Sequence, residues 1–132
     1  MAMSNYLEEK ILNAVLNGGN FTLISEVYIA LYLLDPGEFD MGTEVSGGGY
    51  VRKLVSFTAP IQDPDGKAVV ENDSDIVFDV ASAPWGLITH VGIKDALTGG
   101  NLLFHGALTT PKHVDANDQF KILTGELKIT LS

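Results

Sequence analysis

Residues 26–34, EVYIALYLL, followed at once by a turn at Asp35-Pro36-Gly37, carry the pattern that decides the fold. A short run of aliphatic and aromatic residues that ends in turn chemistry is typical of a β-strand. Tyr28 and Tyr32 lie on one face of this strand, and Ile29 and its alternate neighbours lie on the other. Both faces are therefore apolar, and we expect both to be covered, the second by an N-terminal helix or by another subunit.

The residues before this strand predict an amphipathic helix. Leu7, Ile11 and Val15 recur at four-residue spacing, and Leu12 and Leu16 lie beside them. Asn5 with Glu8 three residues later has the pattern of a capping box, and the Asn-Gly-Gly run after Leu16 is a helix stop. The pattern predicts a helix from Asn5 to Leu16 that lies on the β domain or on a neighbouring subunit.

After the helix, the hydrophobic period changes from about 3.6 to 2. Eight strands are expected, near residues 26–34, 50–58, 67–70, 76–81, 87–94, 102–108, 119–123 and 126–131. Short strands with a turn every few residues favour a mainly β fold, an antiparallel β-sandwich of jelly-roll-like type with one N-terminal α-helix. We expect residues 1–20 to form the helix and an arm, and residues 21–132 to form a single β-sandwich domain.

The composition sets limits on the function. The chain has 132 residues, of which 45% are hydrophobic and 19% are charged, so a packed core is expected. The formal charge of −9 disfavours nucleic acid and anionic membrane surfaces as partners. Cysteine is absent, which excludes disulfides, thiolate metal sites and a cysteine nucleophile. The N-terminus lacks the pattern of a secretory signal, and the longest apolar run is too short for a membrane helix, so we expect a soluble protein.

Residues that could carry chemistry do not form a recognisable site. His90, His105 and His113 lack metal-binding spacing, and we expect the first two to be partly buried and hydrogen-bonded within strands. Ser46 is followed by glycines and is not part of a nucleophile elbow. The glycine run at residues 47–49 is expected to be a bent connection. The sequence therefore predicts no enzyme, no catalytic residues and no cofactor.

Closely spaced aspartates are the remaining candidates for metal binding. Asp63 and Asp65 form one pair and Asp73 and Asp75 another, but the twelve-residue calcium loop is absent. Aspartates in turns more often accept hydrogen bonds from backbone N–H groups, so no metal site is predicted. Whether either pair binds a cation is left open by the sequence.

Large aromatic and aliphatic side chains are the candidates for an interaction surface. Trp85 lies between two predicted strands, where it would fill one end of the core or anchor an interface. The residues that we expect to form an interface are Tyr6, Leu7, Ile11, Tyr28, Tyr32 and Trp85.

A combination of motifs resembles a family of short bacteriophage proteins that are commonly labelled tail-fibre proteins. The motifs are residues 5–8 (NYLE), 28–32 (YIALY), 42–50 (GTEVSGGGY), 85–93 (WGLITHVGI), 95–96 (DA), 98–103 (TGGNLL) and 106–109 (GALT). The resemblance spans nearly the whole chain. It implies a structural component of a phage particle, assembled in the bacterial cytoplasm, without enzymatic residues.

The size of the chain and its lack of repeats predict where the protein would lie in the phage particle. Fibres usually contain repeats or coiled-coil heptads, and this chain has neither. Its size is similar to that of capsid cement proteins, so we expect a decoration protein that forms a homotrimer and clamps neighbouring major capsid subunits. The alternative is a tail-fibre or baseplate protein involved in host receptor binding. Its partners would be copies of itself and other virion proteins.

Overall fold

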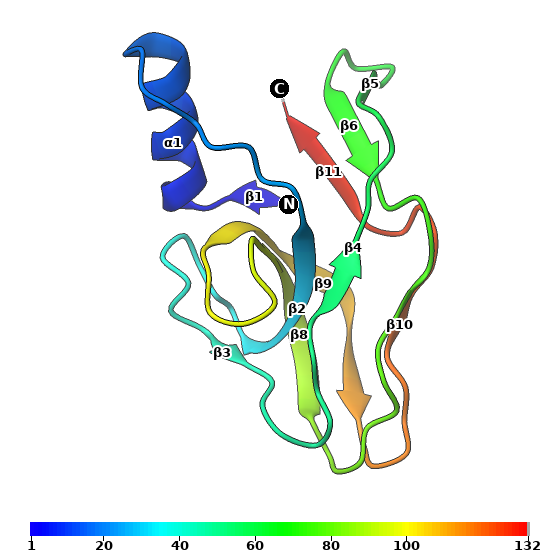
Figure 1. The fold of residues 1–132 in the computed structure, drawn as a ribbon. Coiled ribbons are helices and arrows are strands. Elements are labelled where there is room, and N and C mark those ends of the chain that lie inside the picture. The colour runs from blue at the N-terminus through cyan, green and yellow to red at the C-terminus, as the bar shows by residue number, and fades with distance from the viewer. Residues whose placement is uncertain (132) are drawn as a thin grey trace.

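The computed structural model describes residues 1–131. In this range the chain forms one helix and eleven strands, most of them short (Figure 1). They are β1 (Ala2–Met3), α1 (Asn5–Leu16), β2 (Val27–Leu34), β3 (Thr43–Glu44), β4 (Lys53–Val55), β5 (Ile61–Gln62), β6 (Ala68–Glu71), β7 (Ile76–Val77), β8 (Gly86–Lys94), β9 (Leu102–Val114), β10 (Lys121–Ile122) and β11 (Lys128–Leu131).

The main sheet is the largest layer and contains the three longest strands. Its order is β1-β9-β8-β2-β3, with β4 also paired to β2, and the described pairings are antiparallel. The strand predicted at residues 26–34 lies within this sheet, where Leu31 is opposite Val91 of β8. These apolar segments thus form the sheet on which the rest of the molecule packs.

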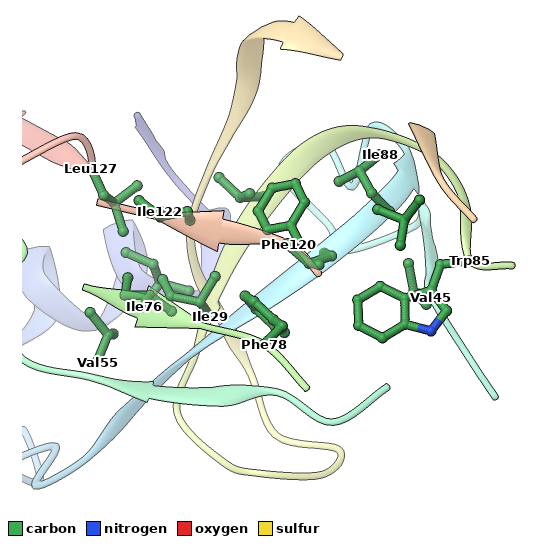
Figure 2. Packing of buried hydrophobic residues seen from close by; sticks show 14 of the residues in the cluster. Ile29, Val45, Val55, Ile76, Phe78, Trp85, Ile88, Phe120, Ile122 and Leu127 are labelled. Carbon is green, nitrogen blue, oxygen red and sulfur yellow. The ribbon is translucent and has the colours of Figure 1, made fainter. Parts of the chain in front are cut away.

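Two smaller ladders form the second layer of a β-sandwich. One pairs β10 with β7, and the other has the order β11-β6-β5. Figure 2 shows Phe78 and Phe120 from this side of the molecule packed with Ile29 of the main sheet. The phenyl rings of Phe78 and Phe120 meet edge to face, with their centroids 5.7 Å apart. The predicted mainly β, antiparallel sandwich with one helix is confirmed.

The N-terminal helix has the predicted bounds but a different cap. Ser4, and not Asn5, is the N-cap, and its side-chain oxygen accepts a hydrogen bond from the N–H of Leu7 at 3.2 Å. The Ser4 hydroxyl also donates to the carbonyl of Leu102 in β9, so the cap joins the helix to the main sheet. Asn17 ends the helix, and Gly18 follows with φ +68°, as the stop signal predicted.

The second face of the main sheet is covered by two loops of the chain itself. Residues 35–42 and 95–101 lie beside the sheet on the side opposite the small ladders (Figure 1). Asp40 accepts a hydrogen bond from the hydroxyl of Tyr32 at 2.8 Å and forms an ion pair with Lys94. The sequence led us to expect the helix or another subunit here. Over Tyr32 that expectation is wrong, because the acidic loop after β2 folds back onto the strand.

Several strand bounds differ from the prediction. Strand β9 continues six residues past the predicted end at Leu108, through Pro111 to Val114. The predicted strand at residues 50–58 shortens to β4, because Tyr50 and Arg52 point into a polar network. The short strands β1, β3 and β5 were not predicted, since two residues give no measurable alternation. No helix in residues 1–131 is long and apolar enough to cross a membrane.

Candidate functional site

The structure buries three of the six residues that the sequence predicted for an interface. Leu7 is 5% exposed, Tyr32 is 1% exposed and Trp85 is 4% exposed within the single chain. Their side chains are in contact with the protein interior and add almost nothing to the surface. We therefore leave these three residues out of any surface that the folded chain presents.

Trp85 fills one end of the sandwich core, as the first of its two interpretations expected. Its ring lies edge to face with those of Tyr50, 5.5 Å away, and Phe78, 6.4 Å away. The indole N–H donates to the carbonyl of Gly48 at 2.8 Å. Gly47, Gly48 and Gly49 have positive φ angles, and a side chain on Gly48 would collide with the Trp85 ring. The glycine run is a bent connection that wraps the tryptophan.

A polar network fixes the loops over the second face. Arg52 is 8% exposed and binds Glu44 through two hydrogen bonds of 2.7 and 2.8 Å. The same guanidinium donates to the carbonyls of Ala96 and Gly99 in the loop 95–101. The Tyr50 hydroxyl donates to Glu44 at 2.6 Å. One arginine thus joins three separate parts of the chain.

The network shifts the protonation of its members. Burial by itself would raise the pKa of the Glu44 carboxyl, but hydrogen bonds from Arg52 and Tyr50 outweigh it and hold the pKa below its usual value. Burial, and then the hydrogen bond to Asp40, raises the pKa of Tyr32. Both tyrosines of the network, Tyr32 and Tyr50, thus keep their protons as donors to carboxylates. The network has a structural role that the sequence did not reveal.

The other three predicted interface residues reach the surface. Tyr6 is 37% exposed, Tyr28 is partly exposed, and both line one open hollow of about 380 Å³ between the start of α1 and the start of β2. Tyr28 donates its hydroxyl proton to Glu26 at 2.7 Å. Ile11 is partly buried against the core. The structure therefore brings Tyr6 and Tyr28 together and places Ile11 in the middle of the helix, against the core.

The second half of helix α1 presents an uncovered apolar surface. Leu12, Val15 and Leu16 are 56%, 72% and 71% exposed, whereas Leu7 in the first half is buried. Figure 1 shows the helix standing beside the sandwich with its C-terminal end away from the body. We call Leu12, Val15 and Leu16 the helix stripe. Exposed aliphatic residues gathered at one end of a helix are typical of a contact surface.

An apolar groove lies at the end of the molecule where β6 and β11 separate from the main sheet. It is open, with a volume of about 270 Å³. Its lining includes Val27, Phe57, Val69, Ile93, Ile129 and Leu131. Leu131, at the rim, is 44% exposed. We call this hollow the apolar groove, and among residues 1–131 nothing fills it.

Sequence reasoning missed the groove. The stripe residues belong to the apolar side of a helix that was predicted to lie on the β domain or on a neighbouring subunit, and within the single chain they are exposed. The groove joins β2, β6 and β11, which are far apart in the chain, so no local pattern could reveal it. Within residues 1–131, seventeen large hydrophobic side chains are exposed, and an apolar surplus of this kind is typical of a protein with contact surfaces.

The histidines and aspartates form local contacts. His90 is 21% exposed and hydrogen-bonds through Nδ1 to the hydroxyl of Thr89, as predicted. His105 differs, because its buried Nε2 has no hydrogen-bond partner in residues 1–131 and lies 3.7 Å from Glu38. Asp63 accepts hydrogen bonds from two backbone N–H groups of its own turn, and Asp75 accepts two from Thr124.

Comparison with known proteins identifies one relationship. A protein-family model described as "Podophage GP4 fiber I protein gp80" matches residues 2–130. The match covers both the helix and the sandwich. No curated protein sequence matches the chain.

Proposed function

Because this chain belongs to the podophage GP4 fiber I protein gp80 family, we propose that it is a compact module of a phage tail fibre that assembles through contacts between its own copies. Membership of the family makes the chain a structural component of a phage virion. A place in the tail fibre, the association with other copies and a non-catalytic role are the parts that we propose.

The family description supports the tail fibre over our first expectation, capsid decoration. It names a fibre protein, and the match extends over nearly the whole chain. The compact shape that favoured a decoration protein is compatible with a fibre if the chain is a knob or joint and not the shaft. A shaft needs long coiled coils or repeats, and the described chain has one helix of twelve residues.

The proposed self-association rests on one observation: each chain has two separate apolar surfaces that the chain itself leaves uncovered. The helix stripe projects from one side of the molecule, and the apolar groove opens between β6, β11 and the main sheet. A projection and a hollow at different places on one molecule allow head-to-tail contacts between copies. Burying Leu12, Val15 and Leu16 would contribute roughly 1 to 2 kcal/mol each.

Head-to-tail contacts close into a ring when the rotation between copies divides a full turn, and otherwise extend into a filament. We propose closure with three copies. Tyr6, which is exposed, and Tyr28, which is partly exposed, line a hollow at the start of the helix, where a docked neighbour would extend the contact. A closed ring and an open filament are both compatible with a fibre, because rings can stack along the fibre axis and a filament can extend along it.

Position in the particle is tested by imaging intact phage with a gold-labelled antibody raised against this chain. Gold on the tail is the expected result. Gold spread over the capsid would contradict the fibre role and would favour decoration.

Self-association is tested with two complementary variants. Leu16→Glu removes the projection and keeps the groove, and Leu131→Glu places a charge at the rim of the groove and keeps the helix stripe. Each variant alone is expected to be a monomer by analytical ultracentrifugation, while the wild-type chain is a trimer. An equal mixture of the two should give a 1:1 dimer, because one intact stripe meets one intact groove.

The control variant is Leu87→Glu, at a residue that is 46% exposed and lies outside both surfaces. It should associate like the wild-type chain. A wild-type monomer at micromolar concentration, or two variants that fail to form dimers when mixed, would contradict the head-to-tail contact.

A further inference from the structure

A second groove, of about 630 Å³, lies between the later half of β9 and the segment that contains β10 and β11. In Figure 1, the orange end of β9 lies in the lower half of the molecule, and the segment with β10 runs along its right side. One wall is residues 106–110 and Lys112 of β9, and the other is residues 120–122 and 126–128. Met1 and Val91 also line the groove. The groove is distinct from the apolar groove and from the hollow that contains Tyr6 and Tyr28.

This groove concentrates positive charge on an acidic protein. The chain has 8 basic residues and a net charge of −9, yet Lys112, Lys121 and Lys128 all line this one hollow. One carboxylate, Glu126, lies with them and already accepts the N–H of Leu123. We call this hollow the lysine groove. Its charge attracts anionic groups although the molecule as a whole repels them.

The lysines of the groove are available for a ligand. Within residues 1–131, no carboxylate lies within ion-pair distance of Lys112 or Lys121, and Lys128 has a long contact of 3.9 Å with Glu71. By contrast, Arg52 and Lys94 are buried in ion pairs of the fold. The groove lysines are exposed, and the Lys112 ammonium is held over the ring of Phe120, 5.9 Å from its centroid.

Strands β9, β10 and β11 contribute residues to the lysine groove and have open edges. Strand β1 pairs with β9 at Phe104 and His105, and beyond these residues no strand of the described chain pairs with that edge. Strands β10 and β11 each have one partner, so each has an open edge too. Open edges offer main-chain N–H and C=O groups to an added extended chain. Their pairing pattern fits a polypeptide better than it fits a polysaccharide.

The residues on these open edges determine which kind of strand can be added. Pro111 and Lys112 lie on the edge of β9, and proline and lysine on open edges discourage unspecific pairing. An acidic strand overcomes this protection, because its carboxylates pair with the lysines. Apolar side chains at the floor, among them Leu108 and Ile122, can receive alternate apolar residues of the same strand.

From this combination of charge, open edges and apolar floor, we propose that the lysine groove binds an extended acidic segment of another virion protein by strand addition. Alternating carboxylate and aliphatic residues are the chemistry that it recognises. This contact does not use the helix stripe or the apolar groove, so it is independent of the proposed association between copies.

The test uses a fluorescent synthetic peptide, a twelve-residue Glu-Val repeat, and measures its binding to the full chain by anisotropy at low and high salt. The expected result is binding that weakens as salt rises. K112E/K121E should weaken it by roughly tenfold or more, since two charge pairs become repulsive. The matched control K10E/K67E changes two exposed lysines outside the groove and should leave the affinity unchanged.

Two further measurements make the test decisive. Backbone amide shifts of the labelled protein should move in residues 106–110 and 121–128 when the peptide binds. Polygalacturonate, a polyanion without a peptide backbone, should bind more weakly and leave these amides unmoved. Equal loss of affinity in both double variants, shifts elsewhere, or polygalacturonate that moves the same amides would overturn the proposal. K112Q/K121Q is the milder variant if charge reversal prevents folding, and it should still lower the affinity.

Discussion

The two faces of the main sheet are covered by different kinds of chemistry. Ile29 and Leu31 face the small ladders, where Phe78 and Phe120 complete a continuous apolar core (Figure 2). Tyr32, on the opposite face, lies under loops that hydrogen bonds and ion pairs hold in place. The comparison teaches that one strand can supply the hydrophobic core and also anchor a polar cover.

The two kinds of cover differ in how strictly they fix the position of the segments and in the free energy lost when a partner is removed. Apolar burial is non-directional, and it tolerates small shifts of the two ladders. The polar cover needs exact partners, because a buried charge without its partner costs several kcal/mol. We therefore expect the apolar face to supply most of the stability, and the polar face to determine where the two loops lie.

Phe78→Ala should have the largest effect on the free energy of unfolding. The side chain is 1% exposed and contacts three aromatic rings, so its loss leaves a cavity in the apolar face. We expect a destabilisation of about 4 kcal/mol, measured by urea unfolding. Val80→Ala, at a residue 52% exposed, is the control and should cost less than about 1 kcal/mol.

Arg52→Met tests the polar face. Methionine fills the space but leaves the Glu44 carboxylate with only the Tyr50 hydroxyl as a donor, and leaves two loop carbonyls without their donor. We expect a loss of about 3 kcal/mol, with altered amide shifts in residues 95–101. Lys53→Met, which removes an exposed ion pair with Asp79, should cost about 0.5 kcal/mol. Similar losses for both variants would refute the special role of Arg52.

The pH dependence of the stability of Glu44→Gln also tests the contribution of the polar face. The folded state holds the pKa of Glu44 below its usual value, so the carboxylate stabilises the fold above the pKa of the unfolded chain, near 4.3. This contribution disappears as the pH falls through the lower folded pKa. The variant should be about 2 kcal/mol less stable than wild type at pH 7, since glutamine keeps an acceptor. The difference should shrink toward zero in acid, and a constant difference from pH 7 to pH 2 would contradict the assignment.

Among the test variants, apart from their controls, Ser4→Ala should have the smallest effect, because it removes one helix cap and one link to β9. We expect a loss of about 1.5 kcal/mol and weaker protection of the helix amides in hydrogen exchange. Asn5→Ala is the matched control. It should leave stability nearly unchanged, since Asn5 lies inside the helix and its side chain does not cap it. A larger loss of stability for Asn5→Ala than for Ser4→Ala would show that Asn5 is the N-cap, as the sequence predicted.

The sequence predicted much of the fold because its signals are local. The helix from Asn5 to Leu16 follows from its apolar spacing and its glycine stop, and the strand at residues 26–34 from its composition and the turn after it. The error at the cap is instructive. Ser4 and Asn5 are both good caps, and the hydrogen bond from Ser4 to Leu102 in β9 decided between them.

The interaction surfaces could be predicted less well than the fold. Tyr6 and Tyr28 are at the surface, but Tyr32 and Trp85 are enclosed by loops whose path no local pattern reveals. Lysines in three separate strands form one groove for the same reason. Basic residues are sparse in this acidic chain, and three of them fall in its last 21 residues. This clustering was the sequence signal that could have indicated the lysine groove.

The sequence by itself determined that this protein is an antiparallel β structure with one helix, because alternation, helical spacing and turn chemistry act between residues close in the chain. The tertiary structure decided which apolar residues became core and which remained exposed. It buried Leu7 and left Leu16 outside, although both belong to one helix. Burial depends on what the distant parts of the chain place nearby, and that is a property of the folded molecule.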